Sequence, residues 1–199
     1  MTNPYGLWHV ARSLLALVIM SIMITACAGS GAGNQEAAEA IEARSFTEQL
    51  GDQRIRSRIM AEILSDNELR HESNIKVTVF RGIALLSGEV PNREAGQRIA
   101  ELAREDSEAA HVHNELVIAP LSSVFARARD NVINTTAKTR LLGIDEPPSL
   151  DPERFLVVTN RARIYLMGRV TQEEADAITE EVRRVRGVRE VVRLFEYPD

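Results

Sequence analysis

The chain contains the stretch NIKVTVFRGIALLSGEV at residues 74–90 and the stretch RFLVVTNRARIYLMGRV at residues 154–170. Each stretch has an alternating strand pattern, a short turn, a second apolar strand and then Gly-x-Val. Two apolar runs this close together predict a β-hairpin. Because the pattern occurs twice, the sequence predicts two similar domains in tandem.

A helix is predicted before and after each hairpin. Before the hairpins, apolar residues recur at helical spacing, first as Ile55, Ile59 and Ile63 and later as Ile133, Ala137 and Leu141. After the hairpins, Ile99 and Ile178 belong to similar stripes. A further strand closes each unit, at residues 113–118 and 191–195. The predicted order is αββαβ, twice, which is an α+β fold. Each unit is near the lower size limit for a stable core, so we expect the two copies to pack together.

Four glycines are predicted to be structural, namely Gly82, Gly88, Gly168 and Gly187. Glycine populates backbone conformations that other residues resist. We expect Gly88 and Gly168 at the ends of their strands, where such a conformation is needed.

The N-terminus predicts export. Arg12 is the only early cation, and an apolar run follows it before the small residues that precede Cys27. This order is typical of a secretory signal, and the run is too short for a membrane span. Cys27 is the only cysteine, so no disulfide can form within the chain. Its position resembles that of the acylated cysteine of bacterial lipoproteins, which implies that Cys27 carries acyl chains such as palmitate. The alternative is an ordinary signal peptide with a chance cysteine.

The sequence divides into five segments. They are a signal peptide (1–26), the acylated cysteine with a Gly-, Ala- and Glu-rich tether (27–51), the first repeat (52–119), a linker (120–125) and the second repeat (126–199).

Composition argues against several classes of function. After removal of the signal peptide, which contains Arg12 and His9, 23 basic residues remain against 29 acidic ones, a net charge of −6 that argues against nucleic-acid binding. His111 and His113 would share one face of a strand, but no third metal ligand is evident. No nucleophile elbow, phosphate-binding glycine loop or His-Glu-x-x-His motif occurs. We therefore expect no metal, no cofactor and no enzymatic activity.

Both repeats resemble BON domains. The resemblance rests on Leu86-x-Gly88-x-Val90, on Leu166-x-Gly168-x-Val170 and on Gly187-Val188. It implies a three-stranded mixed sheet packed with two helices in each unit. Two departures occur, since Glu108-Ala109 replaces the Gly-Val pair of the first copy and Arg161-Ala162 replaces the usual Asn-Gly turn of the second. With the signal and its cysteine, the chain resembles the dual-BON outer-membrane lipoproteins of Gram-negative bacteria.

The resemblance implies binding to anionic phospholipid, phosphatidylglycerol or cardiolipin, and a role in outer-membrane integrity. The family places its lipid-facing surface on the first helix of the second unit. The candidate lipid-binding residues here are Arg129, Val132, Thr135, Thr136, Lys138, Thr139 and Arg140. Val132 stands where the family has a large aromatic, and valine is the weaker membrane anchor. The alternative is an ordinary solvated helix face.

A second basic cluster consists of Arg183, Arg184, Arg186 and Arg189. It is interleaved with acidic residues and is explained by surface ion pairs.

Two other functions stay open. The repeats could form a protein-interaction module for a periplasmic partner, such as an activator of cell-wall hydrolases, or a chaperone-like protein of osmotic stress. Ala28 rather than aspartate follows the cysteine, which favours the outer membrane, on its periplasmic face.

Overall fold

The computed structural model describes residues 45–144 and 151–197. These residues belong to one compact unit, Ala43–Asp199. The predicted signal peptide, Cys27 and most of the predicted tether lie outside the described residues. Among the helices that are described, none combines the length and the hydrophobicity needed to cross a bilayer.

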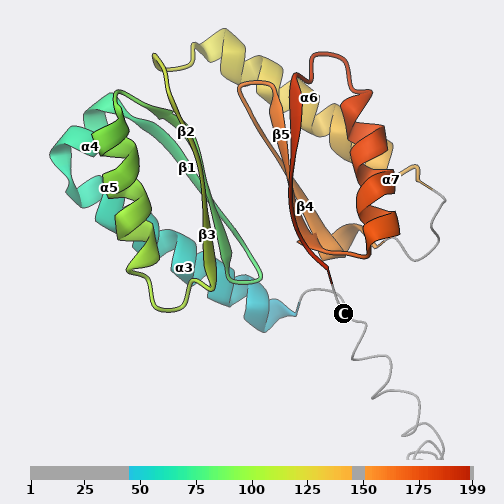
Figure 1. Ribbon diagram of the computed structural model, residues 1–199, viewed down its shortest axis with the longest axis horizontal. Helices are drawn as coiled ribbons and strands as arrows, with labels where there is room; N and C mark the ends of the chain where they lie inside the picture. Colours follow the sequence, from blue (N-terminus) through green and yellow to red (C-terminus); the bar gives the residue numbers. More distant parts are fainter. Residues whose placement is uncertain (1–44, 145–150, 198–199) are drawn as a thin grey trace, which may run out of the picture. The chain divides into compact units, whose positions relative to one another are not determined.

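The described residues form the αββαβ order twice, as predicted (Figure 1). The first half consists of α3 (Phe46–Ser65), the short α4 (Asn67–Glu72), β1 (Asn74–Phe80), β2 (Ile83–Val90), α5 (Arg93–Arg104) and β3 (His111–Ile118). The second half consists of α6 (Val124–Leu141), the 3₁₀ turn η1 (Pro152–Arg154), β4 (Phe155–Asn160), β5 (Arg163–Arg169), α7 (Gln172–Arg183) and β6 (Glu190–Glu196).

Each half has a three-stranded mixed sheet. The orders are β1-β2-β3 and β4-β5-β6. The hairpin strands pair antiparallel, and the closing strand pairs parallel to the middle strand after the crossover through α5 or α7. The predicted α+β fold of two tandem units is confirmed.

The first helix of each half begins earlier than the proposed tether (27–51) and linker (120–125) suggested. Ser45 caps α3 with a capping box, in which its hydroxyl accepts the Glu48 N–H at 3.2 Å and the Glu48 carboxylate accepts the Ser45 N–H at 2.9 Å. Ser123 caps α6 by accepting the Ala126 N–H at 3.2 Å. A serine at this position satisfies N–H groups that have no partner within the helix, and so fixes where the helix starts. Phe125 therefore belongs to α6.

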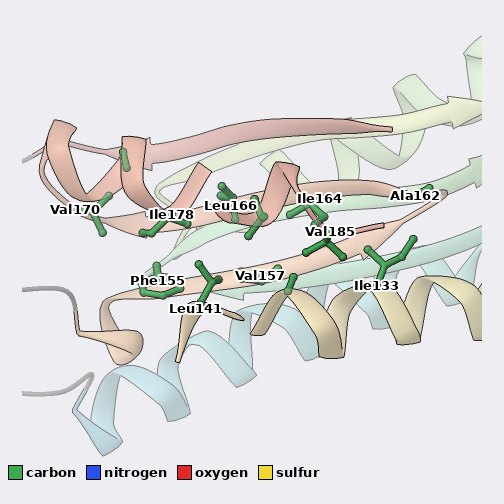
Figure 2. Close-up of a cluster of buried hydrophobic side chains, with 13 residues drawn as sticks. Ile133, Leu141, Phe155, Val157, Ala162, Ile164, Leu166, Val170, Ile178 and Val185 are labelled. Carbon is green, nitrogen blue, oxygen red and sulfur yellow. The ribbon is translucent and has the colours of Figure 1, made fainter. Parts of the chain in front are cut away.

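The two predicted helix stripes are buried. Ile55, Ile59 and Ile63 of α3 pack with β1, β2 and α5 in one cluster. In the second half, the stripe of α6 packs against β4, β5 and α7 (Figure 2). Burying one such aliphatic side chain stabilises the fold by roughly 1.5–3 kcal/mol.

A third cluster joins the two halves. Phe80, Ile83 and Leu85 of the first sheet pack with Val158, Tyr165 and Met167 of the second. These side chains come from the sheet faces that do not carry the helices, so every residue of β2 is buried. The expectation that each small unit completes its core against the other copy agrees with this cluster.

Gly88 lies two residues inside the end of β2, which corrects the expectation from the sequence, whereas Gly168 is the penultimate residue of β5, close to the expected strand end. A Cβ atom on Gly88 would lie 1.9 Å from the carbonyl oxygen of Asn74, and one on Gly168 would lie 2.5 Å from that of Arg154. Both residues also have positive φ, at 132° and 149°. They are glycines because the neighbouring strand comes too close for a side chain.

Candidate functional site

Helix α6 carries all seven candidate lipid-binding residues. Its buried side packs against the sheet of its own domain. Ile133 and the other residues of its stripe enter the core. Beside them, Asn134 Nδ2 donates to the carbonyl oxygen of Val157 at 3.1 Å and to Thr159 Oγ1 at 3.2 Å. These contacts determine which side of the helix remains in solvent.

A buried aspartate ties α6 to the hairpin turn of its domain. The Asp130 carboxylate accepts the backbone N–H groups of Arg161 and Ala162, both at 2.8 Å. Both turn residues have left-handed φ, 51° and 61°, as a two-residue type I′ turn requires. The carboxylate therefore holds a turn in which an alanine occupies a position that usually needs glycine or asparagine.

The first half repeats this arrangement. Asp52 of α3 accepts the N–H groups of Arg81 and Gly82 at 2.9 and 2.8 Å. The sequence contained a signal for this, since an aspartate stands three residues before the first stripe isoleucine in both copies, Ile55 and Ile133. The role was not predicted because it depends on a turn about thirty residues away.

All seven candidate residues of α6 are exposed. Val132, whose side chain is 66 % exposed, lies with Thr135, Thr136 and Thr139 on the side of the helix opposite the buried stripe. Arg129 and Lys138 lie on opposite flanks of that side. Arg140 faces α7, where its Nη1 lies 3.5 Å from Glu181 Oε2.

The same side carries apolar residues that the sequence analysis missed. Phe125 and Leu142 are 85 % and 73 % exposed. Phe125, Val132 and Thr139 are spaced by seven residues, as are Ala128, Thr135 and Leu142, so both series follow the solvent side of α6. We define the outer face of α6 as Phe125, Ala128, Val132, Thr135, Thr136, Thr139 and Leu142. Phe125 was missed because residues 120–125 were assigned to the linker, although it stands one heptad before Val132.

Cations border the outer face on both flanks. Arg127 and Lys138 lie on one flank, and Arg129 and Arg140 on the other. Lys76 of β1 adds a charge close to the first flank. Its own burial, and then the positive charge of Lys138, lower the pKa of Lys76, while the Asp130 carboxylate opposes them. Both halves of the protein thus contribute cations to this surface.

Two of the four arginines in the second basic cluster, Arg183 and Arg184, form ion pairs, whereas Arg186 and Arg189 form none within the described residues. Arg184 Nη2 lies 2.8 Å from Glu180 Oε1, and its Nη1 lies 3.0 Å from Glu181 Oε1. Arg183 Nη1 lies 3.0 Å from Glu180 Oε2. Arg183 and Arg184, at the end of α7, therefore offer less unpaired charge than the surface around α6.

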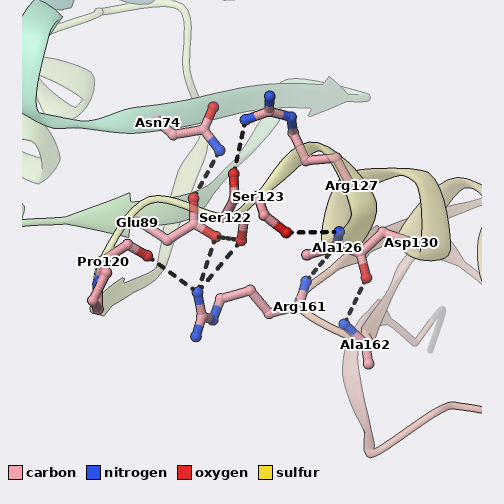
Figure 3. A network of polar contacts seen from close by, with 10 residues as sticks. All are labelled: Asn74, Glu89, Pro120, Ser122, Ser123, Ala126, Arg127, Asp130, Arg161 and Ala162. Carbon is pink, nitrogen blue, oxygen red and sulfur yellow. Dashed lines mark hydrogen bonds and ion pairs between the residues drawn. The ribbon is translucent and has the colours of Figure 1, made fainter.

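A polar network links the two halves beside the start of α6 (Figure 3). Glu89 of β2 is fully buried, and its carboxylate accepts from Ser122 Oγ, from Asn74 Nδ2 at 2.7 Å and from Arg161 Nη1 at 3.4 Å. Arg161 Nη1 also lies 3.4 Å from the carbonyl oxygen of Pro120. Burial raises the pKa of Glu89, but these hydrogen bonds outweigh it, so that the pKa lies below its ordinary value.

Of the histidines, His111 and His113 both lie in β3. Burial lowers the pKa of His113. Within residues 45–144 and 151–197, no group of three or more His, Cys, Asp or Glu side chains is placed to hold a metal ion.

Comparison with known proteins identifies both repeats. The family model described as BON domain matches residues 51–120 and 130–199. The outer membrane lipoprotein DolP of Haemophilus influenzae is 24% identical over 190 residues, which cover 94% of this chain and 97% of that protein. The 21 kDa hemolysin of Actinobacillus pleuropneumoniae is 27% identical over 157 residues, covering 79% of each chain.

A solved structure, the C-terminal domain of CdsD, a structural protein of the Type III secretion system of Chlamydia trachomatis, is 13% identical. The match covers 74% of this chain and 67% of that chain, with a TM-score of 0.28. A likeness at this level supports no conclusion about the present protein.

Proposed function

The chain belongs to the BON domain family, and we propose that it is a non-enzymatic outer-membrane lipoprotein that binds anionic phospholipid through the outer face of α6. In this proposal Cys27 carries the acyl anchor, and the two domains face the periplasm. Support for the location comes from the lipoprotein-like N-terminus and from the similarity to a relative named as an outer membrane lipoprotein. Such a protein would help to keep the outer membrane intact.

The observation that carries the proposal is the composition of the outer face. It combines the exposed Phe125, Val132 and Leu142 with small residues, and cations border it on both flanks. Exposed apolar side chains bordered by basic ones are also found on amphipathic helices that lie in a membrane interface, where the apolar side chains contact the acyl region and the basic ones lie close to the headgroups.

Weak binding would suffice for this function. A buried phenylalanine contributes roughly 1.5–3 kcal/mol, and each cation near an anionic bilayer about 1 kcal/mol. The acyl anchor would hold the domains beside the membrane, so that contact through α6 becomes an intramolecular step at a high effective concentration. The outer face can therefore bind preferentially to anionic membranes, while the acyl chains anchor the protein.

Vesicle flotation of residues 28–199, which lack Cys27 but contain the whole compact unit, tests the proposal. We expect flotation with vesicles that contain phosphatidylglycerol or cardiolipin, little with neutral vesicles, and a loss at high salt. The Val132→Glu/Lys138→Glu variant should lose flotation. Leu64→Glu/Arg56→Glu on α3 makes the same change of charge at exposed positions of the first half, and should retain it.

Absence of flotation under all conditions would contradict the proposal. The acyl chains would then be the sole membrane contact, and the protein-interaction and chaperone alternatives would gain weight. Equal loss in both variants would show that overall charge, rather than α6, governs binding.

A further inference from the structure

A pocket of about 330 Å³ opens beside the start of α6. The connecting segment contributes Leu121, Ser122 and Ser123 to its wall. Three arginines line the rest, namely Arg129 of α6, Arg161 of the β4–β5 turn, and Arg189, which precedes β6. The pocket therefore brings together cations from three separate places in the sequence.

Two of the three arginines have their charge available. Arg161 is directed to Glu89, as described above. In the part of the chain that the structure describes, the guanidinium groups of Arg129 and Arg189 make no hydrogen bond or ion pair, and both side chains are exposed. The acidic side chain in the pocket wall, Asp130, is already bonded to the two N–H groups of the turn. The lining thus favours an anion.

The position of the pocket indicates where that anion comes from. Arg129 belongs both to the pocket lining and to a flank of the outer face. Phe125, one turn earlier on the same helix, is the most exposed large apolar side chain of the described residues, and Leu121 of the wall is itself half exposed. An anion that is attached to acyl chains could therefore enter the pocket while its chains contact these apolar residues.

We propose that this pocket binds the phosphate of an anionic phospholipid headgroup, with Arg129 and Arg189 as its ligands. The inference rests on the proposed function and adds the headgroup subsite to it. Guanidinium groups bind phosphate oxygens with paired N–H donors, which lysine cannot reproduce. The outer face supplies apolar contact, and the pocket supplies the recognition of charge.

Flotation of residues 28–199 with phosphatidylglycerol vesicles, at low salt, provides the test. The Arg129→Gln/Arg189→Gln variant removes both ligands, and Arg54→Gln/Arg56→Gln on α3 removes two exposed arginines of the first half as a matched control. We expect the pocket variant to lower the partition constant roughly tenfold or more, and the control to lower it less than about threefold. Arg129→Lys/Arg189→Lys should recover only part of the loss. Urea unfolding should give the same midpoint for all variants, since the replaced side chains are exposed.

Four results would overturn the assignment, and the last of them would also remove the proposed function. If the pocket variant floats like the control while the wild type floats well, the pocket is not a subsite, although the proposed function stands. If the lysine variant binds as well as the wild type, the pocket is only a region of positive charge. If soluble glycerol phosphate binds residues 28–199 but does not release them from vesicles at constant ionic strength, the pocket takes a soluble phosphate rather than a lipid. A wild type that does not float at all removes both proposals.

Discussion

At the residue scale, a few side chains and glycines determine whether each hairpin can form. Gly88 has an α-carbon hydrogen where any other residue would place a carbon 1.9 Å from the carbonyl oxygen of Asn74. Asp130 supplies acceptors for two turn amides that would otherwise lack a partner. Neither requirement is visible in hydrophobic periodicity, because each depends on a second segment of the chain.

Replacing Gly88 by alanine should destabilise the protein by about 3 kcal/mol or more, because a contact with backbone cannot relax without separating β1 from β2. Gly96→Ala in α5 makes the same chemical change where the nearest atom, Val90 Cγ2, is 3.5 Å from the added carbon. This control should stabilise the protein by about 0.5–1 kcal/mol, as alanine does inside a helix. Urea unfolding measures both, and a neutral Gly88→Ala would contradict the close approach of the strands.

The Asp130→Ala substitution should cost about 2–4 kcal/mol, because it leaves the Arg161 and Ala162 amides without their acceptor. Asn131→Ala, at the neighbouring exposed position, should change the free energy of unfolding by less than about 0.5 kcal/mol. Asp52→Ala should behave like Asp130→Ala if the two turns are equivalent. A small change in the free energy of unfolding at both aspartates would show that the turns are stable without these hydrogen bonds.

At the element scale, α6 has one apolar side in the core and an outer face on which Phe125, Val132 and Leu142 are exposed. The side towards the sheet could be predicted from the sequence, because Ile133, Ala137 and Leu141 recur at the period of a helix. The outer face was predicted only in part. Its N-terminal end, with Phe125, became visible once Ser123 was seen to cap the helix, since a cap is decided by local backbone geometry and not by periodicity.

Substitution of Phe125 by serine should separate stability from membrane binding. Because the side chain is 85 % exposed, the free energy of unfolding should change by less than about 0.5 kcal/mol. Partition onto phosphatidylglycerol vesicles should fall roughly tenfold or more, as expected when an aromatic side chain that is buried in the membrane on binding is removed. Phe46→Ser, at a comparably exposed position of α3, is the control and should leave the partition unchanged. A loss of stability in Phe125→Ser would mean that this residue belongs to the fold.

At the scale of the whole molecule, the two BON domains share a core and a polar network. The αββαβ repeat predicted each domain from local patterns. That Phe80 and Tyr165 belong to one buried cluster could not be predicted, because no local pattern states which sheet faces meet. The same holds for the contact between Glu89 and Arg161, which are seventy-two residues apart.

The Glu89 network should make stability depend on pH. The pKa of Glu89 is lower in the folded protein than its unfolded value of about 4.3, so its contribution is complete above that value and is lost as the pH falls through the folded pKa. Glu89→Gln should therefore be less stable than the wild type at pH 7, and this difference should shrink as the pH drops below about 4. Other carboxylates with lowered pKa values are present in both the wild type and Glu89→Gln, so their contributions to the difference in stability cancel. Urea unfolding at several pH values measures the difference, and one that stays constant with pH would argue against the charged network.

The central claim, that α6 enters the membrane interface, is tested most directly by a tryptophan on its outer face. Trp8 is the only tryptophan of the chain and is absent from residues 28–199, so Phe125→Trp creates a single reporter. With phosphatidylglycerol vesicles, its emission should shift to shorter wavelength and be quenched by brominated acyl chains. Phe46→Trp, on α3, should show neither effect. Unchanged emission from position 125, or equal effects at both positions, would contradict a membrane contact made by α6.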